Sequence, residues 1–176
     1  LTFDNYLDAW NGAGASSANF GSSFLNSIAI ALPATFIPIL IAAFAAYAFT
    51  FMEFKGRDTL FILIVSLLVV PNFVAFIPLQ SIYNNLQFVG FPKVCLAHIG
   101  FGMSLAIFIL RNFMQTLPKS VIESAKIDGA SHYGIFYRLI LPMSVPALAA
   151  FAIFQFLWVW NDLMVALVFL GPGPDE

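Results

Sequence analysis

Four long apolar runs constrain the fold of this chain more than any other feature. They extend over residues 24–51, 59–82, 94–113 and 143–170. A helix needs about 20 apolar residues to cross the hydrocarbon core of a bilayer, and each run is long enough. Of the 176 residues, 61% are hydrophobic and only 9% are charged, so little polar surface remains to cover four such helices in water. We therefore predict an all-α fold, a polytopic helical membrane bundle with four spans.

The composition also argues against several function classes. The formal net charge is −2, and the seven basic residues are scattered, so we expect no nucleic-acid partner. The single cysteine, Cys95, allows neither an intrachain disulfide nor a multi-cysteine metal site, and we predict no metal. The sequence contains no phosphate-binding G-x-x-x-x-G-K-[ST] run and no H-E-x-x-H, and its histidines are only His98 and His132. We therefore expect no catalytic residues and no cofactor in this chain.

The basic residues predict the topology. Six of them lie in or beside two connections: Lys55 and Arg57 between the first two runs, and Arg111, Lys119, Lys126 and Arg138 between the last two. Only Lys93 lies between the middle pair. The positive-inside rule places the first and third connections in the cytoplasm, so both ends of the chain are expected outside. Residues 1–23 are polar and glycine-rich, which predicts a loosely structured external tail.

The connection 116–141 is expected to be cytoplasmic and to carry its own helical structure. Thr116 is a candidate N-cap, with Pro118 in the first turn, and Gly129 is suited to end a helix of about ten residues. Ser131 is a candidate cap for a second helix that runs to Pro142, where the last span is expected to begin. Residues 121, 122 and 125 form a small apolar patch that suits either docking of a soluble partner or packing against the helix ends.

Within this connection, residues at fixed spacing resemble a known motif. The pattern begins with Glu123-Ser124-Ala125, continues after three residues with Gly129 and ends, nine residues later, with residues 139–142 (Leu-Ile-Leu-Pro). It resembles the EAA loop of permeases of binding-protein-dependent ABC importers. Ser124 and Leu139 depart from the usual alanine and isoleucine. The likeness extends from residues 26–27 to residues 158–162 and is closest to the oligosaccharide branch, which includes maltose and α-glucoside permeases.

The resemblance implies a function, partners and a location. The family's loop forms a helix that rests on the ATPase, which implies these ATPase-coupling residues: Glu123, Ser124, Ala125, Gly129, Leu139, Leu141 and Pro142. Implied partners are an ATP-binding cassette ATPase dimer, a second permease subunit, an external solute-binding protein, a carbohydrate substrate and the lipid bilayer of a bacterial or archaeal inner membrane. ATP and Mg would belong to the ATPase subunits. Because six helices are common in the family, the chain is expected to be a fragment that lacks one span at each end, in keeping with its start at Leu1.

Polar residues in the apolar runs are candidates for the substrate path, because lipid-facing polar groups are costly. Gln155, Trp158 and Asp162 recur at i, i+3 and i+7, which predicts an amide, an indole and a carboxylate on one helical face, a chemistry suited to sugars. Asn161 and Asn72 are added as weaker candidates. The alternatives left open are that Trp158 anchors the helix at the membrane interface, that Asp162 lies at that interface, and that the amides join helices.

An ion-coupled secondary carrier is the alternative function. Such carriers use ionisable groups near the middle of the membrane. Here Asp162 is expected near the outer edge and Arg111 near the inner one. The pattern therefore favours the importer permease.

Overall fold

The computed structural model describes residues 3–12 and 19–171, and these residues form helices and short connections without a strand. This confirms the all-α prediction. In chain order the helices are α1 (Asp4–Asn11), α2 (Phe20–Phe51), α3 (Arg57–Ser66), η1 (Leu67–Val69), α4 (Asn72–Asn85), α5 (Phe91–Gln115), α6 (Lys119–Ile127), α7 (His132–Ile135), η2 (Phe136–Ile140), α8 (Leu141–Met143), α9 (Val145–Trp160) and α10 (Met164–Leu170).

Two of these helices, α2 and α5, are each long and apolar enough to cross a membrane, and up to four spans result if each of two bent helix pairs counts as one. The first predicted run, 24–51, lies in α2, which begins earlier, at Phe20. The Asn19 side chain caps α2 there by accepting the Ser22 backbone N–H at 3.1 Å. The third predicted run, 94–113, lies wholly inside α5.

The second predicted run is not one straight helix. The α3–η1 segment and α4 meet at 103°, and the break lies at Val70-Pro71. Proline disfavours helical geometry in the residue before it, and Val70 is accordingly extended, with ψ 121°. The run 59–82 is therefore a helix pair broken at Pro71, and whether the pair forms one span stays a prediction.

The fourth predicted run, 143–170, is also interrupted. Residues His132–Met143 and α9 are bent by 68° around Ser144, so the last long helix begins after Pro142 rather than at it. At the other end α9 stops at Trp160. The Asp162 carboxylate accepts the Val165 N–H at 3.1 Å, a side-chain bond that supports a new helix start.

The tail over residues 1–23 is more ordered than its composition predicts. Residues 4–11 form α1, which ends at Gly12 in the left-handed conformation (φ 73°). Trp10 packs against Phe20 and Phe24 of α2, with ring centroids 6.0 Å apart in both pairs. Aromatic packing thus stabilises a segment that its polar residues predict to be loose; residues 13–18 lie outside the described part.

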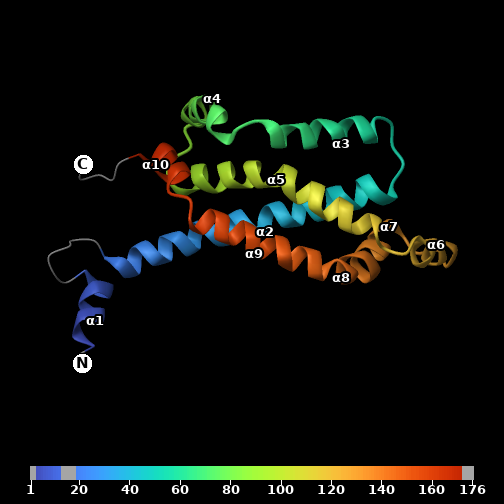
Figure 1. Ribbon diagram of the computed structural model, residues 1–176, viewed down its shortest axis with the longest axis horizontal. Helices are drawn as coiled ribbons and strands as arrows, with labels where there is room; N and C mark the ends of the chain where they lie inside the picture. The colour runs from blue at the N-terminus through green and yellow to red at the C-terminus, as the bar shows by residue number, and fades with distance from the viewer. Residues whose placement is uncertain (1–2, 13–18, 172–176) are drawn as a thin grey trace.

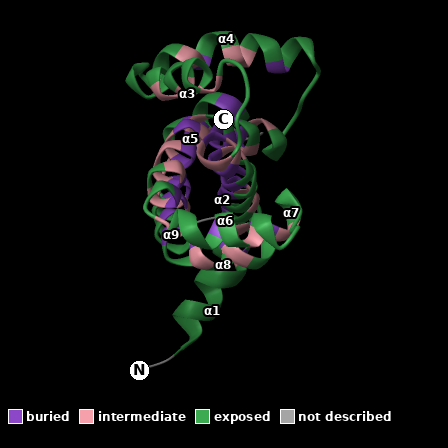
Figure 2. Ribbon diagram, turned by 90° about the vertical axis from the view of Figure 1, so that its right-hand side faces the viewer, coloured by how far each residue is buried: buried purple, intermediate pink, exposed green. Residues whose placement is uncertain are grey.

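The core lies where α2, α5 and α9 pack together. In Figure 2 the buried residues line the facing sides of these helices, whereas α3 and α4 lie to one side and are mostly exposed. Alanines on α2, among them Ala42 and Ala46, are fully buried beside Ala106 and Leu110 of α5. Small residues let membrane helices approach closely, which compensates for the lack of a hydrophobic drive between helices in lipid.

The arrangement of the ends agrees with the pattern of basic residues. The α2–α3 connection and the α6–α7 segment lie at the same end of the bundle, whereas α1, α4 and α10 lie at the opposite end (Figure 1). The two connections that the positive-inside rule assigns to one side of the membrane are therefore neighbours in space. Which side that is stays a prediction.

Candidate functional site: a helical segment at the end of the bundle and a polar pocket between helices

The segment predicted to couple to an ATPase is built as two short helices around a glycine turn. Gly129 has φ 79°, and the N–H of Ala130 donates to the carbonyl of Ala125 at 2.9 Å, while the N–H of Gly129 donates to Lys126 at 3.0 Å. This is the Schellman pattern, which favours glycine because its left-handed residue needs no Cβ. Ser131 then caps α7 by accepting the Gly134 N–H at 3.2 Å, as predicted.

The predicted start of α6 needs a correction. Thr116 does not cap it, because its hydroxyl donates to the Phe113 carbonyl at 2.7 Å and Thr116 ends α5. The residue before α6 is Pro118, whose extended backbone leads into Lys119. A threonine near a helix boundary can serve either helix, and the sequence alone does not distinguish the two.

The two faces of α6 have different surroundings. Ile122 is only 4% exposed and Ala125 is half-buried, and both pack on the main core cluster, so this part of the apolar patch faces the bundle. Glu123 and Ser124 are exposed, and Ile127 is 86% exposed. The helix is therefore fixed by one face and presents the other at the end of the bundle (Figure 1).

The remaining predicted coupling residues connect this segment to α9. Leu139 and Leu141 are half-buried against the core, and Pro142 is exposed in α8. Residues Phe136–Ile140 form a π-helical turn. Such turns occur often at functional sites. The change of direction into α9 comes at Ser144, two residues after the proline that was expected to set it.

A contact that the sequence analysis missed fixes α7 to α2. The Tyr47 hydroxyl shares a hydrogen bond of 3.0 Å with Nδ1 of His132, and the Tyr47 ring packs edge-on against Phe136, with centroids 5.3 Å apart. The Phe44 and Phe136 rings stack at 4.6 Å. The one signal in the sequence was a tyrosine near the end of a largely apolar span.

Gln155 joins three helices instead of facing an open path. Its side chain is fully buried, and Nε2 donates to the carbonyls of Ala34 at 3.2 Å and His98 at 3.4 Å. The Ala34 carbonyl would ordinarily accept the N–H of residue 38, but that residue is Pro38 and has none. Gln155 thus supplies the donor that the proline removes, which is how membrane helices tolerate internal prolines.

The Gln155 carboxamide sits in its present position only because residue 102 is a glycine. A Cβ added at Gly102 of α5 would lie 2.6 Å from both Nε2 and Oε1 of Gln155, closer than real Cβ contacts come. The carboxamide therefore occupies the space that any larger residue at position 102 would need.

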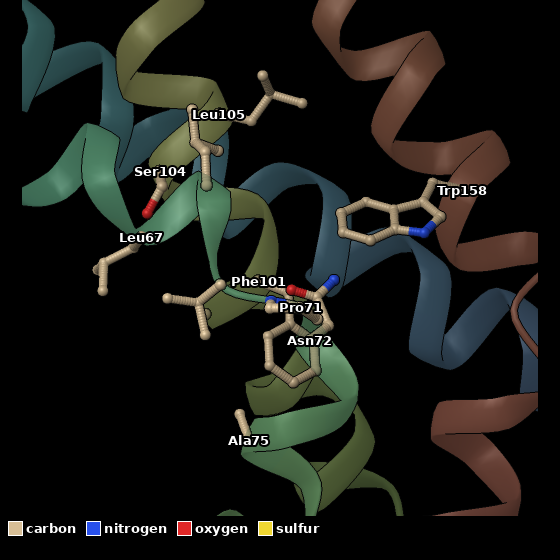
Figure 3. A pocket seen from close by; sticks show the side chains of 11 residues that line it. Leu67, Pro71, Asn72, Ala75, Phe101, Ser104, Leu105 and Trp158 are labelled. Atoms are coloured by element: carbon tan, nitrogen blue, oxygen red, sulfur yellow. The ribbon is translucent and has the colours of Figure 1, made fainter.

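Two of the predicted path residues meet at a different place. Asn72 and Trp158 line a pocket of about 350 Å³ at the bend between η1 and α4, together with residues of α5. Figure 3 shows their side chains there, with the indole on one side and the amide on another. Ser104, which is buried, adds a hydroxyl. The sequence analysis missed Ser104; its position as a polar residue inside the apolar run 94–113 was the available signal.

Asn161 and Asp162 do not join this pocket. The Asn161 amide donates to the Leu157 carbonyl at 2.7 Å, and the Asp162 carboxylate accepts the Val165 N–H at the start of α10. The predicted continuous helical face of Gln155, Trp158 and Asp162 does not extend to Asp162, because α9 ends at Trp160, and Gln155 packs between helices. Whether any of the three lines the substrate path stays a prediction.

Comparison with known proteins identifies the chain's relatives. Residues 38–175 match the family described as "Binding-protein-dependent transport system inner membrane component". The chain is 54% identical to the "Alpha-glucoside transport system permease protein AglG" of Rhizobium meliloti, an alignment that covers 100% of this chain and 47% of the relative. It is 57% identical to the "Osmoprotective compounds uptake permease protein GgtD" of Synechocystis sp., covering 90% and 54%. It is 35% identical to the "Diacetylchitobiose uptake system permease protein NgcG" of Streptomyces coelicolor, covering 93% and 53%.

The chain spans about half the length of these relatives. The match covers most of the chain, including α5, the glycine-turn segment and α9. The chain belongs to the family of binding-protein-dependent transport system inner membrane components.

Proposed function

We propose that this chain is part of the permease subunit of an ATP-driven importer of carbohydrates, and that α6 and α7 transmit movements of a separate ATPase to the spans. The observation that carries the proposal is the build of α6, which is anchored in the core by Ile122 and presents Glu123 and Ser124 outward at the end of the bundle. The family match supports an importer subunit over an ion-coupled carrier.

The packing suggests how a movement would pass inward. Ile122 of α6, Ile135 of α7 and Ile140 of η2 all belong to the same buried cluster as Ala46 of α2 and Leu110 of α5. Because close-packed interiors deform little, a displacement of α6 would shift its neighbours instead of being absorbed locally. The Tyr47–His132 hydrogen bond adds a second connection, to α2.

The partners follow from this role. An ATP-binding cassette ATPase dimer would hold ATP and Mg, an external solute-binding protein would deliver the substrate, and a second permease subunit would complete the path. The ends of the chain that carry α1 and α10 would lie outside, and α6 would lie on the cytoplasmic side. The importer would reside in a bacterial or archaeal inner membrane, in keeping with the organisms and family description of the relatives.

The substrate class is proposed from the relatives and from the pocket. Names among the relatives include an α-glucoside, diacetylchitobiose and trehalose system, all of them sugars or sugar derivatives. In the pocket at the η1–α4 bend, the Trp158 ring could cover the apolar face of a pyranose. Asn72 and Ser104 could exchange hydrogen bonds with its hydroxyls.

The coupling role is tested by adding bulk to the exposed face of α6 in the full-length permease. Ser124→Tyr should prevent close approach of the ATPase, so the ATPase should no longer co-purify and uptake of radiolabelled α-glucoside should be lost. Thr59→Tyr is the matched control, an equal enlargement of an exposed hydroxyl residue at the same end of the bundle. Normal co-purification and uptake with Ser124→Tyr would count against the docking role of α6.

The substrate path is tested at the two pocket residues Trp158 of α9 and Asn72 of α4. Trp158→Leu and Asn72→Leu should reduce sugar uptake about tenfold or more, or change the preference between two sugars, while the complex still assembles and hydrolyses ATP when stimulated by the binding protein. Trp160→Leu is the control, because Trp160 stacks on Phe156 at 5.5 Å and lies outside the pocket. Equal losses for both tryptophans would assign Trp158 a packing role only.

A further inference from the structure

A cavity of about 290 Å³ lies at the end of the bundle that carries most basic residues, apart from the pocket already described. It is enclosed by the end of α2, the first residue of α3, the last turns of α5 and the first residue of α6. Its lining residues are Phe49, Thr50, Phe51, Arg57, Arg111, Gln115 and Lys119. We call it the basic pocket; three of its seven residues are cationic and none is acidic.

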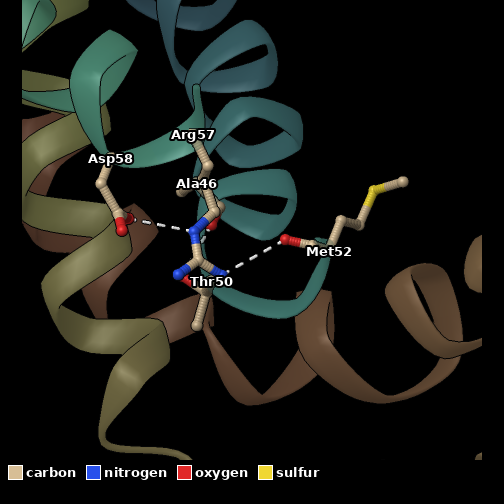
Figure 4. Close-up of polar contacts among 5 residues, drawn as sticks. All are labelled: Ala46, Thr50, Met52, Arg57 and Asp58. Atoms are coloured by element: carbon tan, nitrogen blue, oxygen red, sulfur yellow. Dashed lines mark hydrogen bonds and ion pairs between the residues drawn. The ribbon is translucent and has the colours of Figure 1, made fainter. Parts of the chain in front are cut away.

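Little within the protein neutralises these cations. The one salt bridge among the described residues joins Arg57 to Asp58 at 3.1 Å, and a second Arg57 nitrogen donates to the Met52 carbonyl at 3.4 Å (Figure 4). Arg111 and Lys119 have no carboxylate within ion-pair distance in the described part of the chain. Two positive charges therefore face this cavity without a protein counter-charge.

Arg111 is held so that it can serve a ligand. Its guanidinium carbon lies 3.9 Å from the centre of the Phe61 ring, a cation–π contact that fixes the side chain. Its Nε is buried and has no acceptor in the structure. The Arg111 side chain as a whole is half-buried and lines the cavity, so an anion there would meet the accessible part of the guanidinium rather than the buried Nε.

The pocket's donors suit an anion with several oxygens. Arginine recognises phosphate through parallel N–H groups, lysine supplies a point charge, and the Gln115 amide offers a further donor. Lys119 also begins α6, whose N-terminal end carries positive partial charge. The Thr50 hydroxyl is not available as a donor, because it donates to the Ala46 carbonyl at 2.7 Å (Figure 4).

We propose that the basic pocket is a binding site for a phosphate group, presented either by the headgroup of an anionic phospholipid or as free phosphate. Its position favours the lipid: it lies at the ends of membrane-length helices, and the half-buried Phe51 gives it an apolar edge beside which an acyl chain can lie. Basic pockets between spans are a recognised form of lipid headgroup site. A bound headgroup would touch both α5 and α6 and would thus influence the position of the proposed coupling helix.

The test uses the full-length permease in its purified complex and native mass spectrometry to measure retained lipid. Wild-type protein should retain phosphatidylglycerol in preference to phosphatidylcholine, whose choline cation the pocket repels. Lys119→Gln and Arg111→Gln should each weaken phosphatidylglycerol retention about fivefold, the effect of one basic residue at a membrane surface. Arg111→Lys should retain part of the binding. Lys55→Gln, an equal loss of charge in the neighbouring exposed connection, should leave it unchanged.

The experiment distinguishes lipid from free phosphate, and a specific site from general surface charge. If an excess of inorganic phosphate does not displace the retained phosphatidylglycerol, the site binds lipid. If phosphate displaces the lipid and also binds on its own, the site binds free phosphate. Equal losses in Lys119→Gln and Lys55→Gln would overturn the proposal, because they would indicate general surface charge. So would unchanged retention in Lys119→Gln, whose exposed position makes misfolding no explanation. Loss of the co-purifying ATPase with unchanged lipid binding would instead assign the cations to a protein contact.

Discussion

Replacing Gln155 by leucine should destabilise the bundle without changing which sugar is imported. Leucine has nearly the same volume, so the change removes the hydrogen bonds to Ala34 and His98 and adds little cavity. Hydrogen bonds between membrane helices contribute about 0.6 kcal/mol on average and up to about 1.7 kcal/mol. The 3.2 Å bond to Ala34 is within the usual range and the 3.4 Å bond to His98 is longer, so we expect a loss of about 1–2 kcal/mol in the free energy of unfolding.

The structure also predicts that this loss depends on Pro38. Pro38→Ala restores an N–H that can donate to the Ala34 carbonyl within α2. In the Pro38→Ala background, Gln155→Leu no longer leaves that carbonyl without a donor, so its cost should fall by about half. The coupling energy in this double-mutant cycle should be about 0.5–1 kcal/mol, although the two residues are far apart in sequence.

The assay is reversible unfolding of the full-length permease in mixed detergent micelles, followed by circular dichroism. Asn112→Leu, the same kind of change at an exposed position of α5, serves as the control and should be near neutral. A coupling energy of zero would refute the account of Pro38 and Gln155. Unchanged stability combined with an altered sugar preference would refute it more fully and return Gln155 to the substrate path.

Three further predictions concern two glycines and the topology. Gly102→Ala should destabilise the protein, because its Cβ would lie 2.6 Å from the Gln155 carboxamide on α9. Gly100→Ala is the control, because its Cβ would have no atom within 4 Å, and thermal melting compares the two variants. Gly129→Val should strain the positive φ by about 1–2 kcal/mol, so uptake and stimulated ATP hydrolysis should fall together while membrane insertion is retained, and normal uptake would speak against a coupling role. Cysteines at Lys55 and Asn84 should be labelled by an impermeant thiol reagent from the cytoplasm and from outside, respectively; the reverse result would invert the proposed topology.

The glycine-turn segment shows how much local sequence can predict. Gly129 and Ser131 act through hydrogen bonds to residues within five positions of them, so their roles follow from the order of residue types. The start of α6 was mispredicted for a related reason: Thr116 has a competing acceptor in Phe113, also nearby. Local rules thus identified the segment but did not resolve which of two neighbouring helices a capping residue serves.

The candidate path illustrates what periodicity cannot predict. A helical spacing places Gln155, Trp158 and Asp162 on one face only if the helix is continuous, and α9 ends at Trp160. The pocket that does form brings Trp158 together with Asn72 and Ser104 from two other helices. Such convergence depends on how the helices pack, which no single stretch of sequence contains.

The sequence by itself determined that this protein is a helical membrane bundle with a capped two-helix segment between its last two apolar runs, because hydrophobic length and local caps act over one helix at a time. The tertiary structure decided what its prolines do. Pro71 lies at the 103° break between η1 and α4, whereas Pro38 lies inside the uninterrupted helix α2. The free carbonyl that Pro38 leaves finds a donor in Gln155, 121 residues away from Ala34 in the chain. Only the packing of α9 against α2 brings that donor within reach, so only the folded protein distinguishes the two prolines.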